Sequence, residues 1–278
     1  MHAVARAVHN CRRRAMIRSG WPREHGRHER PVVVQAGGLV ALQFDESAVQ
    51  SCMLAQEPYA LALGYTRTMM GFLLFQPDPR RISIVGLGGG SLAKYCYRYV
   101  PDATITAVEI NPEVLALRSQ FQIPPDDERF AAICADGAHY VDSSDHHPDV
   151  LLVDGFNAEG VPPQLCSRAF YTACRRQLPD NGLLVANLIS SDSGFRSCVR
   201  SLRAVFNDAV TLAPAEDSPE NVIVFAWKGP AERLSLDMPF ARARVLEARH
   251  PLNLCETAIR IAYGKTIDWD ERTADART

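Results

Sequence analysis

Four glycines and a downstream set of acidic residues are the part of this chain whose types and spacing could do chemistry. The glycines lie in the segment 86–90, directly after a mostly apolar run, 81–85, and before an amphipathic segment, 91–99. Glycine lets the backbone turn sharply and lets a ligand approach main-chain N–H groups. The pattern predicts a buried strand, a tight turn and a helix start beside a ligand. The alternative is an ordinary strand-to-helix turn.

Three acidic residues follow at the ends of later apolar runs: Glu109, Asp136 and Asp154. Since ligands of open α/β sheets bind at the carboxyl ends of the strands, these side chains are expected at one edge. Glu109 suits the two hydroxyls of a ribose, Asp136 with Gly137 suits an adenine amino group, and Asp154 is left for the reacting group. Each also has an ordinary alternative, as a helix cap for Glu109 and Asp136 and as a turn residue for Asp154.

The glycine segment lacks the marks of two common nucleotide sites. A nicotinamide dinucleotide fingerprint has Gly or Ala at its sixth position, where this chain has Ser91, and no Gly-Lys-Ser/Thr motif is present. A nucleoside without phosphates, such as S-adenosylmethionine or a relative, fits the pattern better.

The elements that must position these residues alternate between strand and helix. We predict strands at 82–86, 104–109, 130–134, 149–154, 182–188 and 222–227, and helices at about 91–99, 112–120, 137–142, 167–178 and 193–206. Strands that are nearly continuous apolar runs, each followed by a helix, indicate a parallel sheet covered on both faces. The last strand is antiparallel if residues 208–212 supply a hairpin partner.

The flanking regions predict a division into four parts. Residues 1–30 hold eight arginines without apolar periodicity and read as a disordered basic tail, with a nucleic-acid-binding arm as the weaker alternative. Residues 31–56 form a β-hairpin unit with a Gly37-Gly38 turn and a possible further strand. Residues 57–264 form the catalytic domain, which includes a long helical run at 59–75 and helical character at 231–248 and 254–263. Residues 265–278 are expected to be frayed.

Composition limits the partners and the compartment. The net charge of −2 gives no sign of a nucleic acid partner, and no apolar run approaches the roughly 20 residues that span a bilayer. A secretory signal is not expected, because the N-terminal region has charge but no apolar core. The eight cysteines contain no C-x-x-C pair, which predicts buried reduced thiols in a cytoplasmic protein and no metal site.

These motifs resemble the spermidine synthase family, the aminopropyltransferases, over about residues 31–228. The segments that carry the resemblance are Gln50, the Tyr65 region, 79–90, 108–110, 135–137, 153–155, 169–171 and 181–182. The resemblance implies a Rossmann-like, class I methyltransferase fold with a mostly parallel seven-stranded sheet, a small N-terminal β-unit and a homodimer.

The resemblance also implies a reaction. Decarboxylated S-adenosylmethionine gives its aminopropyl group to a small-molecule amine and leaves methylthioadenosine. An amine with a pKa of roughly 10 is mostly protonated at pH 7, so it must first lose a proton. Asp154 matches the family position that can accept this proton. By the same matching, the nucleoside contacts are Gln50, Gly86, Gly88, Gly90, Glu109, Asp136 and Gly137, and the amine contacts are Tyr65 and Asn157.

Three departures leave other functions open. The family has an Asp where this chain has Gly89, a second Asp where it has Asn157, and a Tyr in the loop that is here 215–220. Glu159, Asp192, Glu216 and Asp217 are candidates to replace the missing carboxylates. Gly89 removes a charge that would repel a methionine carboxylate, which favours an S-adenosylmethionine-dependent methyltransferase as an alternative. An incomplete amine pocket also fits a nucleoside-binding homologue without catalysis.

Overall fold

The computed structural model describes residues 30–44, 49–143, 145–157, 160–230 and 239–269. Its N-terminal unit is a three-stranded antiparallel sheet of β1 (Pro31–Ala36), β2 (Leu39–Phe44) and β3 (Val49–Leu54). Gly37 and Gly38 have φ values of 58° and 80°, as a two-residue hairpin turn requires. The predicted Gly-Gly hairpin and the further strand are therefore confirmed. Leu42 and Met53 pack in the same core cluster as Leu92, which fixes this sheet to the rest of the protein.

The main sheet has seven strands in the order β6-β5-β4-β7-β8-β10-β9. They are β4 (Arg81–Val85), β5 (Thr104–Glu109), β6 (Phe130–Cys134), β7 (Val150–Val153), β8 (Leu183–Ile189), β9 (Val210–Ala215) and β10 (Ser218–Trp227). Strand β10 pairs antiparallel with both of its neighbours, whereas the pairs among β4 to β8 are parallel. The predicted mostly parallel seven-stranded sheet is confirmed, with β9 as the hairpin partner of β10.

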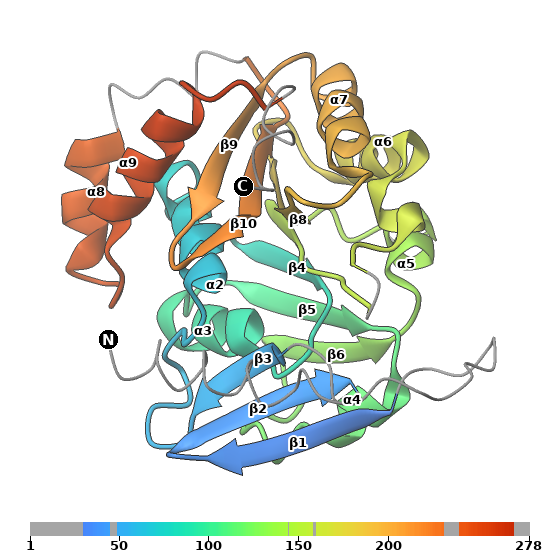
Figure 1. The fold of residues 1–278 in the computed structure, drawn as a ribbon, viewed down its shortest axis with the longest axis vertical. Coiled ribbons are helices and arrows are strands. Elements are labelled where there is room, and N and C mark those ends of the chain that lie inside the picture. The colour runs from blue at the N-terminus through green and yellow to red at the C-terminus, as the bar shows by residue number, and fades with distance from the viewer. Residues whose placement is uncertain (1–29, 45–48, 144, 158–159, 231–238, 270–278) are drawn as a thin grey trace.

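Helices cover both faces of this sheet (Figure 1). One face carries α2 (Gly64–Met69), the 3-10 helix η1 (Met70–Leu74), α3 (Ser91–Tyr99), α8 (Pro239–Glu247) and α9 (Leu254–Gly264). The other carries α5 (Gly137–Ser143), the 3-10 helix η2 (Pro163–Cys166), α6 (Arg168–Gln177) and α7 (Phe195–Val205), while α4 (Pro112–Ala116) contacts β5 and β6. Two apolar clusters, one per face, therefore enclose the central strands.

The long helix predicted at 59–75 is wrong in extent. The structure has a short α2 that continues as η1, and residues 61–63 precede it in a non-helical loop. The Arg67 guanidinium donates hydrogen bonds to the carbonyl oxygens of Leu61 and Ala62, at 2.8 and 3.2 Å. These side-chain contacts satisfy the two carbonyl groups outside the helix, although the segment has apolar periodicity.

The chain beyond α9 also differs from the expectation of a frayed tail. Trp269 is buried at 3% exposure, lies against Phe195 with tilted rings whose centroids are 6.1 Å apart, and donates from Nε1 to the Gly264 carbonyl oxygen at 2.8 Å. The segment is therefore anchored by Trp269, whereas Lys265, Thr266 and Asp268 are exposed. The expectations for 1–29, 231–238 and 270–278 concern residues outside the described ones.

The prediction of reduced thiols is wrong for one cysteine pair. Cys166 at the end of η2 and Cys198 on α7 form a disulfide with a Cα–Cα distance of 5.1 Å. They are 32 residues apart, so the sequence spacing gave no sign that η2 packs against α7. Cys52, Cys96 and Cys174 are buried thiols outside any disulfide, as expected.

Candidate active site

A cleft lies over the carboxyl ends of β4, β5, β6 and β7, where the strand order reverses. The predicted site residues that line it are Gln50, Tyr65, Gly86, Gly88, Glu109, Asp136, Gly137 and Asp154. The small N-terminal sheet supplies Leu42, Phe44 and Gln50 to one wall, so it takes part in the site. Apolar walls with a few convergent polar groups are typical of small-molecule sites.

The glycine turn after β4 needs glycine for steric reasons at Gly86. Its φ is +96°, and a Cβ there would lie 2.2 Å from the Asp154 carbonyl oxygen. Gly88 also has a positive φ, of +50°, but a Cβ there would meet only Ser51, at 3.7 Å. The strand ends β4 and β7 therefore touch through Gly86, which sets the distance between the turn and Asp154.

Glu109 closes β5 and joins it to the glycine turn. Its carboxylate accepts hydrogen bonds from the N–H groups of Leu87 and Gly88, both at 3.1 Å, and of Asn111 at 3.0 Å. A carboxylate has about four acceptor positions, so capacity is left for a ligand hydroxyl. The helix-cap alternative does not describe Glu109, because Asn111 caps α4 by accepting from the Glu113 N–H at 2.9 Å.

Asp136 has the ordinary role that the sequence left open. Its Oδ1 accepts from the His139 N–H at 2.8 Å at the start of α5. This bond uses one of the two carboxylate oxygens while the residue lines the cleft beside Gly137. A capping role and a ligand contact are therefore compatible.

Asp154 follows β7 and is held by two side chains from other elements. Asn187 on β8 donates from Nδ2 to its Oδ1 at 2.9 Å, and the Tyr65 hydroxyl on α2 donates to its carboxylate. Burial raises the pKa of Asp154 to about 6, against the opposing effect of these two hydrogen bonds. Burial, and then the nearby Asp154 charge, holds the pKa of Tyr65 well above its usual value, so the phenol stays protonated. Asp154 is thus a carboxylate that can exchange a proton near neutral pH.

Two predicted site residues lie outside the cleft lining. Gly90 precedes α3 with a φ of +71°, and a Cβ there would lie 2.5 Å from the Ile123 side chain. Its glycine therefore serves packing behind the turn. Asn157 is exposed and forms an isolated β-bridge with Gly160. Gly90 thus lies in the glycine turn but faces away from the cleft lining, and Asn157 lies beyond that lining.

The space beside Gly89 holds a hydroxyl and an aromatic ring. A Cβ at this position would lie 2.7 Å from Ser51 Oγ and 2.9 Å from the Phe121 ring. Ser51 and Ser91 approach each other with Oγ atoms 3.5 Å apart. An Asp at position 89 would therefore require the neighbours to move, and neutral hydroxyls occupy this corner instead.

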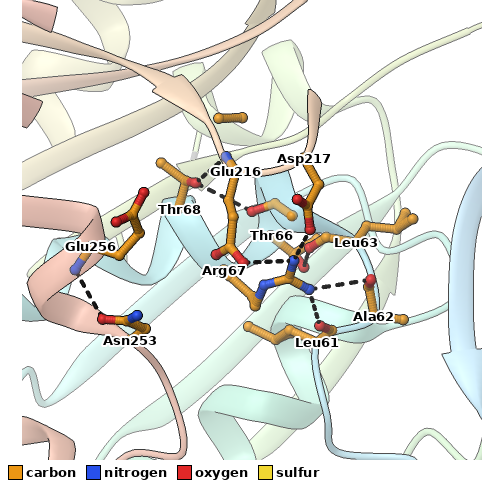
Figure 2. Close-up of polar contacts among 12 residues, drawn as sticks. Leu61, Ala62, Leu63, Thr66, Arg67, Thr68, Glu216, Asp217, Asn253 and Glu256 are labelled. Atoms are coloured by element: carbon orange, nitrogen blue, oxygen red, sulfur yellow. Dashed lines mark hydrogen bonds and ion pairs between the residues drawn. The ribbon is translucent and has the colours of Figure 1, made fainter. Parts of the chain in front are cut away.

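Two of the candidate replacement carboxylates are already paired. Arg67 contacts Glu216 at 2.9 Å and Asp217 at 2.7 Å, so both carboxylates face the guanidinium (Figure 2). Asp192 lies against Gly160 and the Val161 N–H. Glu159 falls outside the described residues. Glu216 and Asp217 therefore already have a cationic partner in this structure.

Sequence reasoning missed three residues that lie outside the cleft lining and contact other side chains near it: Arg67, Asn221 and Ser218. Asn221 Nδ2 donates to Asn187 Oδ1 at 3.0 Å, and the Ser218 hydroxyl donates to Asn221 Oδ1. The only signal in the sequence was an Asn in an otherwise apolar strand, which gives no partner.

Within the described residues, no group of three or more His, Cys, Asp or Glu side chains is arranged to hold a metal ion. Among the helices of the same ranges, none is long and apolar enough to cross a membrane.

Comparison with known proteins agrees with this architecture. The family model described as the spermine/spermidine synthase domain matches residues 62–233. A polyamine aminopropyltransferase of Neisseria meningitidis is 37% identical over 249 residues, covering 89% of this chain and 92% of the relative. A spermidine synthase solved with the transition-state analogue AdoDATO aligns with a TM-score of 0.64 and 19% identity, covering 89% of this chain and 95% of its own.

A human methyltransferase-like protein 13, solved with SAH, shares the fold at a TM-score of 0.57 and 24% identity, covering 76% of this chain and 97% of its own. Fold alone therefore does not separate the two reaction classes. The family match and the 37% identical relative favour the aminopropyltransferases, because both matches extend over most of the chain. On that evidence the chain belongs to the spermine/spermidine synthase family.

Proposed function

We propose that this protein is an aminopropyltransferase that moves the aminopropyl group of decarboxylated S-adenosylmethionine to a small-molecule amine. The observation that carries the proposal is Asp154, a carboxylate with its pKa raised to about 6, in the same cleft as the glycine turn and Glu109. The family match and the polyamine aminopropyltransferase relative support the same transfer.

In this proposal the nucleoside lies between the glycine turn and the small sheet. Glu109 and Gln50 accept or donate hydrogen bonds at the ribose side, Asp136 with Gly137 meets the adenine, and Gly86 and Gly88 leave room for close approach. Ser51 and Ser91 lie next to Gly89, where neutral hydroxyls meet the far end of the donor.

Asp154 and Tyr65 act on the amine. The Asp154 carboxylate accepts the ammonium proton, and the freed nitrogen lone pair attacks the carbon bonded to the sulfonium. The carbon–sulfur bond breaks, its electron pair returns to sulfur, and methylthioadenosine leaves as a neutral thioether. The proton that the amine lost rests on Asp154 until water takes it. Holding the amine in line with the sulfonium carbon supplies much of the rate enhancement.

Methyl transfer is the second candidate, and the hydroxyl-lined corner at Gly89 favours it. Neutral groups there do not repel a donor that keeps its carboxylate. The donor would then be S-adenosylmethionine, and the products would be a methylated amine and S-adenosylhomocysteine.

Product analysis separates these reactions. The protein is incubated with an amine panel and either decarboxylated or intact S-adenosylmethionine, and the products are identified by mass spectrometry. The proposal predicts methylthioadenosine and an aminopropylated amine from the decarboxylated donor. S-adenosylhomocysteine with a methylated amine would establish the second candidate. Tight binding of methylthioadenosine without turnover on any amine would contradict both and favour a nucleoside-binding homologue.

The finer features of the proposal follow the family. We propose a cytoplasmic homodimer without nucleic acid or membrane partners. Size-exclusion chromatography with light scattering gives the mass in solution and tests the dimer directly.

A further inference from the structure

A series of hydrogen-bonded polar side chains, one buried and two partly buried, runs from Asp154 to the start of β10. Asn187, which is 3% exposed, donates from Nδ2 to Asp154 Oδ1 at 2.9 Å. Its own Oδ1 accepts from Asn221 Nδ2 at 3.0 Å, and Asn221 Oδ1 accepts from the Ser218 hydroxyl. The first two members lie on the adjacent antiparallel strands β8 and β10. These strands are otherwise largely apolar, and the buried Asn187 amide needs partners at both its NH₂ group and its oxygen, because an unpaired buried polar group is costly.

Hydrogen-bond chemistry fixes the direction of this chain. An ionised carboxylate only accepts, so Asn187 must present its NH₂ group to Asp154 and its oxygen to the other side. A donor is then required at that other side, and the Asn221 NH₂ group supplies it. The Asn221 oxygen in turn faces the Ser218 hydroxyl, which donates. Reversal of the Asn221 amide would place two oxygens face to face and would favour reversal of Asn187 as well.

The Ser218 end of this hydrogen-bonded series lies beside a turn that is held against α2. Ser218 begins β10 directly after the β9–β10 turn, and Figure 2 shows that turn held on α2. Arg67 binds Glu216 and Asp217, and the Glu216 N–H donates to Thr68 Oγ1 at 2.9 Å. Helix α2 also carries Tyr65, the other side chain that bonds Asp154. Both partners of the Asp154 carboxylate are thus anchored to the same α2–turn unit.

We propose that Asn221 is a positioning residue, which fixes the Asn187 amide with its NH₂ group toward Asp154 and so keeps the Asp154 carboxylate ready to take a proton. The proposal rests on the base role of Asp154 in the proposed function. Asn221 itself touches neither substrate nor the reacting atoms. It acts through Asn187.

The other ionisable groups around Asp154 do not replace this effect. Tyr65 faces it from α2, while Glu109 and Asp136 line the same cleft from β5 and the end of β6. Arg67 on α2 pairs with Glu216 and Asp217 at the β9–β10 turn. Burial raises the pKa of Asp154, while its contacts with Asn187 and Tyr65 lower it, so a change in the orientation of the Asn187 amide acts on this pKa directly.

Two substitutions at one position test the proposal. Asn221→Asp gives Asn187 an acceptor in place of a donor, which turns the Asn187 oxygen toward Asp154 and adds a nearby charge. Asn221→Leu only removes the donor, so Asn187 is free to reverse without a new charge. The control is Ser190→Ala, which removes a hydroxyl that bonds the Glu220 carbonyl oxygen at 3.1 Å near the same strand ends but outside the chain.

The direct measurement is an NMR titration of the Asp154 carboxyl carbon in aspartate-labelled full-length protein, assigned with Asp154→Asn. The pKa should rise by about one unit or more in Asn221→Asp, rise less in Asn221→Leu, and stay in place in Ser190→Ala. Folded fractions are checked by thermal unfolding. An unchanged Asp154 titration in both folded Asn221 variants would overturn the proposal.

The kinetic measurement is the pH profile of kcat/KM with the best donor and amine pair. The acid limb should move upward with the titration: a rise of one unit from about 6 gives roughly a fivefold loss at pH 6, with recovery to within about threefold at pH 9. A uniform loss at every pH with the limb in place would make Asn221 merely structural. The titration needs no turnover, so a protein inactive on every amine would contradict the proposed function while the NMR result still decides the orientation role.

Discussion

At the scale of single residues, Asp154 is where burial and hydrogen bonding oppose each other. Burial raises the pKa of its carboxyl, while Asn187 and Tyr65 stabilise the charged form and limit that rise. The position of Asp154 after an apolar run could be predicted from sequence, since parallel strands end at one edge. Its two partners could not, because Tyr65 lies 89 residues before it and Asn187 lies 33 residues after it.

The raised pKa of Asp154 makes a prediction about stability. The folded state holds this proton up to about pH 6, whereas the unfolded chain releases it near 3.8. The stabilising contribution of the protonated Asp154 carboxyl to the free energy of unfolding is therefore fully present below pH 3.8. It is lost as the pH rises toward and through 6, by up to about 2–3 kcal/mol. Urea unfolding across pH 4 to 7.5 measures it, as the difference between wild type and Asp154→Asn.

Other groups titrate in the same window, so only the pH dependence of the difference is informative. The free energy of unfolding of Asp154→Asn should increase relative to that of wild type as the pH rises from 4 to 7. A difference that stays constant over this range would show that the Asp154 carboxyl titrates normally.

At the scale of elements, the turn between β4 and α3 sets the geometry of the cleft. Four glycines after an apolar run predicted this turn, but not that the glycines have unequal roles. Gly86 and Gly88 line the cleft, Gly89 packs on Ser51 and Phe121, and Gly90 packs on Ile123. Ser51 of the N-terminal sheet and the 118–123 segment pack against Gly89 and Gly90. These contacts cannot be predicted from the spacing of the glycines alone.

Alanine at two of these glycines provides a matched test. Gly86→Ala should abolish methylthioadenosine binding and destabilise the fold, because its Cβ would lie 2.2 Å from the Asp154 carbonyl oxygen. Gly88→Ala meets nothing closer than 3.7 Å and should cost only the left-handed backbone penalty of about 1–2 kcal/mol. Calorimetric binding and urea unfolding measure both. Equal effects in the two variants would contradict this steric account.

At the scale of the whole molecule, the parallel sheet with helices on both faces follows from the alternation of apolar runs and helices. Contacts between segments far apart in the sequence do not follow from it. The Cys166–Cys198 disulfide joins η2, whose Gln164 and Leu165 line the cleft, to α7. Scattered cysteines without a paired motif gave no reason to expect it. The same holds for Trp269, which returns to the core from a segment that looked frayed.

The disulfide predicts a redox-dependent stability. A loop of 32 residues closed by a disulfide is expected to contribute about 3 kcal/mol. Excess dithiothreitol should lower the free energy of unfolding of wild type by that amount. The Cys166→Ser/Cys198→Ser variant should start at the lower value and not respond. The pairing would be contradicted if the free energy of unfolding of wild type did not change with the reductant and thiol titration found Cys166 and Cys198 reduced.

The measurement that tests the central claim most directly compares turnover with nucleoside binding in Asp154→Asn. If Asp154 takes the amine proton, kcat should fall by a factor of about 10²–10⁴, while the Kd of methylthioadenosine stays within about threefold of wild type. Asp102→Asn, on a carboxylate 73% exposed, is the control and should change neither. Full turnover in Asp154→Asn would contradict the account, and loss of nucleoside binding together with turnover would assign Asp154 to the binding site instead.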